Sequence, residues 1–100
     1  MFDFINKLFG STSSEVLKDE IQKGAELIDV RTRGEFSEGH VKTSKNIPLD
    51  EIEGSLNELA KEKTYILVCA SGIRSRNAVA ILKRHGFVSV HNGGSWTSFL

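Results

Sequence analysis

The sequence predicts a single α/β domain with a central parallel β-sheet flanked by helices on both faces. Short apolar runs typical of strands alternate along the chain with longer segments of helical spacing. That alternation is typical of parallel sheets joined by right-handed crossovers. The most hydrophobic run, residues 65–69, is too short for a helix core and rich in β-forming residues, which indicates a strand buried on both faces. A length of 100 residues favours one hydrophobic core rather than two.

The first half of the chain is predicted to hold two helical segments and two strands. In order, they are a helix at 15–23, a strand at 26–30, a helical turn at 33–38 and a strand at 44–47. Ser13 or Ser14 offers an N-cap oxygen for the first helix, and Gly24 offers a stop. Pro48 halts the second strand.

The second half repeats the alternation. In order, we predict a helix at 50–61, a strand at 65–69, a helix at 75–84 and a strand at 88–90. Ile52, Leu56 and Leu59 have helical spacing and give the first of these helices an apolar stripe. His85-Gly86 ends the second helix, and Asn-Gly-Gly at 92–94 follows the last strand.

Residues 1–12 are predicted to be a separate N-terminal segment, and residues 13–100 the domain itself. The apolar side chains of this segment have the spacing of one face of a short helix: Phe2, Ile5, Leu8 and Phe9. Polar residues interrupt them, whereas a secretory signal needs roughly 7–15 uninterrupted apolar residues. The segment is either a weak membrane-surface or partner-docking helix, or a stretch that packs on the core or frays. We favour the second interpretation, because one short, nearly uncharged turn binds bilayers poorly.

Composition excludes several classes of function. Thirteen basic and thirteen acidic residues cancel, so no overall field attracts nucleic acid or an anionic membrane. No segment approaches the roughly 20 apolar residues of a membrane span, and we expect a cytoplasmic protein. Three histidines without paired spacing and a lone cysteine predict no metal site. No cofactor is expected.

The candidate chemistry lies in residues 69–76, where a buried strand ends at Cys69 and a helix begins near Ser75. Ligands of parallel sheets bind beyond the C-terminal ends of the strands. Inward-pointing loop N–H groups and the helix N-terminus would stabilise a thiolate against the free-cysteine pKa of about 8.5. Arg74 adds a fixed positive charge. The predicted substrate-binding loop comprises Ala70, Ser71, Gly72, Ile73, Arg74 and Ser75. The alternative, that Cys69 merely fills the end of a strand, does not account for this combination.

A series of motifs gives a resemblance to a known family. They are Leu27-Ile28-Asp29-Val30-Arg31, Glu35-Phe36, Gly39-His40-Val41, Asn46-Ile47-Pro48-Leu49, Cys69-x-x-Gly72-x-Arg74-Ser75, Gly86-Phe87 and Gly93-Gly94. In this order they make the chain resemble a single-domain rhodanese from about Glu15 to Trp96. The resemblance implies a sulfurtransferase in which Cys69 takes sulfane sulfur from thiosulfate or a persulfide donor, becomes a persulfide, and passes the sulfur to cyanide or a thiol. It implies small sulfur donors, thiol acceptors or a sulfur-carrying protein as partners.

Two details refine this expectation. Asp29 and Arg31 are interpreted as an ion pair or hydrogen-bond anchor that fixes the loop. Ala70 and Ser71 stand where efficient thiosulfate enzymes often place cations. We therefore expect weak thiosulfate binding, with a persulfide or protein-bound sulfur as the donor.

Two other functions remain open. Related phosphatases and arsenate reductases use Cys-x5-Arg, whereas only four residues separate Cys69 from Arg74 here. The shorter loop favours sulfur transfer over oxyanion chemistry. A non-catalytic rhodanese-like module that carries sulfur or binds a partner is the alternative from a different class.

Overall fold

The computed structural model describes residues 13–100, so the predicted N-terminal segment lies outside the described residues. The strands are β1 (Glu26–Asp29), β2 (Lys45–Asn46), β3 (Tyr65–Cys69) and β4 (Val90–Ser95). The α-helices are α2 (Ser14–Gln22), α3 (Arg33–Glu38) and α4 (Ile73–Arg84). The 3₁₀-helices are η1 (Leu49–Glu51), η2 (Glu53–Glu58) and η3 (Trp96–Phe99). Among these described residues, no helix combines the length and apolar composition needed to cross a membrane.

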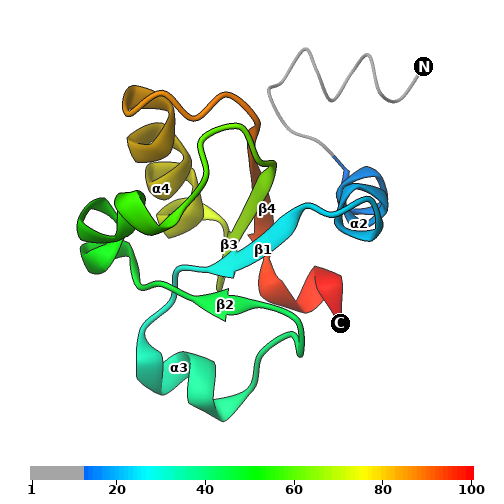
Figure 1. The fold of residues 1–100 in the computed structure, drawn as a ribbon. Coiled ribbons are helices and arrows are strands. Elements are labelled where there is room, and N and C mark those ends of the chain that lie inside the picture. Colours follow the sequence, from blue (N-terminus) through cyan, green and yellow to red (C-terminus); the bar gives the residue numbers. More distant parts are fainter. Residues whose placement is uncertain (1–12) are drawn as a thin grey trace.

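The strands form one parallel sheet in the order β2-β1-β3-β4, which confirms the predicted fold class. Figure 1 shows α4 on one side of the sheet and α2 with η3 on the other. Each face has its own apolar cluster. The α4 side includes Ile28, Leu67, Ala78 and Leu82, and the α2 side includes Leu17, Leu27, Ile66, Val68 and Phe99. All five residues of β3 are buried, so this strand fixes the position of whatever follows it.

The helix predicted at 50–61 is wrong in type: the structure has the two 3₁₀-helices η1 and η2 there. A 3₁₀-helix places residues three apart on one line. Leu49 and Ile52 have that spacing, as do Leu56 and Leu59, and all four pack against the α4 side of the sheet. Gly54 also weakens an α-helix at this point.

Three predicted boundaries are also wrong. The last strand runs over Val90–Ser95 rather than 88–90. Val88 is 81% exposed, while Phe87 turns into the core and begins the approach to the strand. The Asn-Gly-Gly segment at 92–94 belongs to β4 itself, where the register shifts opposite Leu67 and Val68. Helix α4 begins at Ile73, two residues earlier than expected, and β2 is limited to Lys45–Asn46.

Gly93 lies in β4 at a place where only a glycine fits. A Cβ atom there would lie 2.8 Å from Val68 Cγ1 and 2.9 Å from Ile66 Cγ2. Both of those side chains are fully buried in the sheet. Gly93→Ala should therefore lower the free energy of unfolding by about 1–3 kcal/mol, the usual cost of overpacking a core.

Urea unfolding monitored by circular dichroism measures this effect. Gly54→Ala is the matched control, because nothing lies within 4 Å of its added Cβ. The control should stay within about 0.5 kcal/mol of the parent. Equal stability of the two variants would contradict the close packing at Gly93.

Candidate active site

The Cys69 thiol lies at the C-terminal end of β3 and is 1% exposed. Its Sγ accepts the backbone N–H of Gly72 at 3.0 Å and that of Ser75 at 3.5 Å. The Ser75 hydroxyl oxygen is also 3.5 Å from Sγ. Two backbone N–H donors and one hydroxyl, from the loop and the first turn of α4, therefore surround the sulfur.

These donors change the acidity of the thiol. Burial raises the pKa of Cys69, but hydrogen bonding with the Ser75 side chain and hydrogen bonds from the N–H groups of Ser75, Gly72 and Ser71 lower it. The donors outweigh burial, so the pKa of Cys69 lies below the usual value for a thiol. Because the thiolate is the reactive form of cysteine, the geometry favours a nucleophile at this position.

Gly72 allows the loop to turn back onto the sulfur. Its φ of +104° is a left-handed backbone conformation that side chains resist. A Cβ on Gly72 would also lie 3.3 Å from the Gly94 Cα on β4. Gly72 is the N-cap of α4, and its carbonyl accepts the N–H of Arg76 to begin the helix. The short loop thus aims both its own amides and the helix N-terminus at Cys69.

The outer rim of the loop is neutral. Ala70 and Ser71 are exposed, and Ile73 is 61% exposed. A hollow of about 290 Å³ opens beside Ala70. Its lining residues are Arg31, Glu35, Glu38, Gly39, Ala70 and Trp96. The rim therefore offers small and apolar surface, with acidic groups close by.

Arg74 is paired with an acidic side chain from a distant part of the chain. Its guanidinium donates to the two Glu35 carboxylate oxygens, at 2.7 Å and 3.1 Å. Glu35 reaches it from α3, which lies 39 residues away in the sequence. Its side chain also accepts the Thr32 N–H and completes the capping box of α3. The Thr32-x-x-Glu35 spacing is a sequence signal for that cap, but not for the pairing with Arg74.

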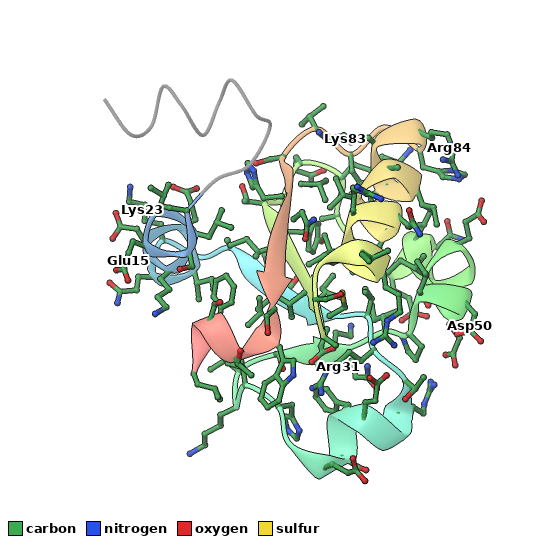
Figure 2. All side chains as sticks on the ribbon, turned by 180° about the vertical axis from the view of Figure 1, so that it is seen from behind. Glu15, Lys23, Arg31, Asp50, Lys83 and Arg84 are labelled. Atoms are coloured by element: carbon green, nitrogen blue, oxygen red, sulfur yellow. The ribbon has the colours of Figure 1, made fainter. Side chains whose placement is uncertain are left out.

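Asp29 and Arg31 form a buried ion pair at the end of β1. The Arg31 guanidinium donates to both Asp29 carboxylate oxygens at 2.7–3.0 Å, and also to the Gly39 carbonyl at 2.7 Å. Asp29 is 0% and Arg31 4% exposed. The guanidinium carbon lies 4.3 Å from the centre of the Trp96 ring. Figure 2 shows Arg31 between the sheet and α3, so the pair ties the α3 segment to the strand ends that surround Cys69.

Asn92 of β4 belongs to the same site, although the sequence offered no signal for it. Its side chain contacts Ser75 and Gly72, the two residues whose N–H groups contact Sγ. The structure thus brings Cys69 and its predicted loop together with two further side chains, Glu35 and Asn92. In the described part of the chain, no cluster of three or more His, Cys, Asp or Glu side chains could hold a metal ion.

The Glu35–Arg74 pair predicts a specific pH dependence of stability. Hydrogen bonding from Arg74, with further bonds from Thr32, lowers the pKa of Glu35 to about 2. Because the folded pKa lies below the unfolded one, the pair stabilises the fold above pH ~4.5 and loses its contribution as the pH falls toward 2. The carboxylate is partly exposed, so we expect a small effect.

Glu35→Gln keeps the capping position of α3 but removes the titrating group. The melting temperature of the parent should fall more steeply than that of the variant between pH 4.5 and 2. Parallel curves for the two proteins would contradict the pairing.

Comparison with known proteins identifies the family. The family model described as "Rhodanese-like domain" matches residues 13–99. The putative sulfurtransferase YtwF of Bacillus subtilis (strain 168) is 36% identical over 84 residues, and the match covers 82% of each chain. The uncharacterized protein YqhL of the same organism is 37% identical over 68 residues. That match covers 68% of this chain and 54% of YqhL, so the chain spans about half the length of that relative.

The solved structures agree. A rhodanese-like domain protein from Staphylococcus aureus superposes with a TM-score of 0.77 at 32% sequence identity, and the match covers 90% of both chains. The fold that carries the Cys69 loop is therefore shared with this solved rhodanese-like protein. The chain belongs to the rhodanese-like domain family, a sulfurtransferase-type family.

Proposed function

We propose that this protein transfers sulfane sulfur through a persulfide on Cys69. In the first half-reaction the Cys69 thiolate attacks the outer sulfur of a donor persulfide. The sulfur–sulfur bond of the donor breaks, a bond forms to Sγ, and the donor leaves as a thiolate. In the second half-reaction a thiophile such as cyanide attacks the outer sulfur, leaves as thiocyanate, and returns Cys69 to the thiolate. Each step transfers one sulfane sulfur atom and needs no external oxidant or reductant.

The observation that carries the proposal is the set of N–H donors around Cys69 Sγ. The Gly72 N–H at 3.0 Å and the Ser75 N–H at 3.5 Å would stabilise the negative charge that Sγ carries as a thiolate, at the start of the first half-reaction and at the end of the second. No partnered base is needed, since the thiol is already acidified by its loop. The lone cysteine provides no second thiol to release the sulfur, so the acceptor must come from outside the chain.

The surroundings of the loop favour a persulfide over thiosulfate as donor. Thiosulfate is a dianion and needs positive charge at the rim. The Arg74 guanidinium is already bound by Glu35, and Arg31 is buried against Asp29. The rim residues Ala70, Ser71 and Ile73 carry no charge. The exposed Ile73 side chain instead suits an apolar or protein-bound donor.

Two other functions are alternatives to the persulfide cycle. A sulfur-carrier or interaction module would load sulfur without rapid turnover, or not load it at all. A cysteine phosphatase or arsenate reductase would need a free cation over an oxyanion, and the Arg74–Glu35 pair argues against that chemistry. The persulfide cycle is therefore the function that the site supports best.

Thiocyanate production from cyanide tests the proposal, with thiosulfate and glutathione persulfide supplied as donors in separate assays. We expect turnover with the persulfide and a thiosulfate KM in the millimolar range or above. Glu35→Gln should lower the thiosulfate KM by roughly fivefold, because a freed Arg74 charge adds about 1 kcal/mol of attraction. Turnover from neither donor would favour the interaction module. A thiosulfate KM in the micromolar range would contradict the donor assignment.

A further inference from the structure

Asn92 makes three side-chain hydrogen bonds around the reactive loop. Its Oδ1 accepts the Ser75 hydroxyl at 2.6 Å and the Gly94 N–H at 2.9 Å. Its Nδ2 donates to the Gly72 carbonyl at 3.1 Å. The side chain thus reaches from β4 to the two residues that contact Cys69 through their N–H groups.

The Ser75 hydroxyl has one proton and two neighbours that compete for it. Its oxygen lies 2.6 Å from Asn92 Oδ1 and 3.5 Å from Cys69 Sγ. A hydroxyl donates one hydrogen bond but can accept others. At the observed distances the proton lies toward Asn92, so the hydroxyl oxygen faces the sulfur as an acceptor. This arrangement suits a protonated thiol, whose S–H can donate to Oγ.

A thiolate requires the opposite arrangement. It has no proton to donate, so the Ser75 hydroxyl must turn and donate to Sγ. Asn92 Oδ1 can release the hydroxyl because the Gly94 N–H remains bound to it. The Gly72 carbonyl also keeps its bond from Nδ2. The Ser75 hydroxyl can therefore turn toward Sγ while the Asn92 side-chain amide keeps two of its three hydrogen bonds.

We propose that Asn92 is a positioning residue for Cys69: the Asn92 side chain sets the direction in which the Ser75 hydroxyl donates its hydrogen bond. Asn92 holds the hydroxyl in the direction that favours the thiol and gives it up when the sulfur is negatively charged. The inference rests on the proposed role of Cys69 as nucleophile. It goes further by assigning a function to a side chain on the neighbouring strand.

The turn of the hydroxyl moves no ionisable side chain. On the elements around the sulfur and Asn92, in the part of the chain that the structure describes, these groups are Arg74 of α4, Glu35 of α3, Asp29 and Arg31 at the end of β1, and Arg76 and His91, which line a hollow together with Asn92. The first four form two ion pairs. Substitution of Asn92 by alanine leaves all of these charged groups in place, and the comparison with Ser75→Ala separates the effect of the hydroxyl from that of the lost bond to the Gly72 carbonyl.

The test is the pH dependence of Cys69 alkylation by iodoacetamide, followed by intact mass. Asn92→Ala frees the hydroxyl for the sulfur and should lower the pKa of Cys69 by about one, which raises alkylation at neutral pH up to tenfold. Ser75→Ala should raise the pKa, and by more in the Asn92→Ala background than in the parent. Alkylation needs no sulfur donor, so the result is independent of whether the persulfide cycle operates.

An unchanged or raised pKa in Asn92→Ala would overturn the proposal, as would an equal Ser75→Ala effect in both backgrounds. If Asn92→Ala does not fold, Asn92→Asp provides the test, because it keeps the shape and the acceptor. Asn92→Asp should raise the pKa of Cys69, and less so when Ser75 is also replaced by alanine. The same rise with and without Ser75 would show a simple charge effect and would overturn the role of the hydroxyl.

Discussion

Cys69→Ser is expected to reduce thiocyanate production by about 10³-fold or more, to the rate of the reaction without protein. Serine can accept the Gly72 and Ser75 N–H bonds that the sulfur accepts, so the loop should keep its shape. Its hydroxyl does not ionise near neutral pH and cannot form a persulfide. The activity should therefore be lost while the fold is retained.

A circular dichroism spectrum and a thermal melt provide the control for this variant. Both should match those of the parent closely, since the substitution changes one buried atom. Residual turnover at a tenth of the parent rate in a folded variant would contradict the assignment of Cys69 as nucleophile. Retained binding of a partner protein by the same variant would support an interaction role beside the chemistry.

Of the substitutions proposed for this protein, Asp29→Ala should lower the free energy of unfolding most, by about 3–5 kcal/mol. The substitution leaves the Arg31 guanidinium buried without its carboxylate, and Arg31 is only 4% exposed. An unpaired buried charge costs far more than the lost attraction alone. The loss should be visible as an earlier transition in urea unfolding.

Two further variants make this prediction specific. Replacing Asp29 by alanine together with Arg31 by methionine removes both charges and should recover part of the loss. Glu51→Ala breaks the exposed ion pair with Arg33 and should have a much smaller effect, because exposed pairs contribute little. A single Asp29→Ala variant within about 1 kcal/mol of the parent would contradict the buried pair.

The sequence predicted the features that depend on local pattern. The five apolar residues of β3 predicted a buried strand that ends at Cys69. Gly72 and the start of α4 follow within four residues, so the donor ring around the sulfur could be anticipated from chain order alone. Parallel strands and crossovers then followed from the alternation of elements.

Features that depend on contacts between distant segments could not be predicted in this way. Glu35 reaches Arg74 across 39 residues, and Asn92 reaches Ser75 across 17. Gly93 was predicted to follow the last strand, but it lies within β4, where an added Cβ would meet Ile66 and Val68. In each case tertiary packing decided between conformations that the local sequence allows.

Whether Cys69 takes up and releases one sulfur atom decides between sulfur transfer and a purely structural thiol. The intact mass of the protein is measured after incubation with glutathione persulfide, and again after addition of cyanide, with peptide mapping to locate the adduct. We expect a gain of one sulfur atom on the peptide that contains Cys69, and its complete removal by cyanide with release of thiocyanate. An unmodified thiol after treatment with the donor, in a protein that is otherwise folded, would contradict the persulfide cycle.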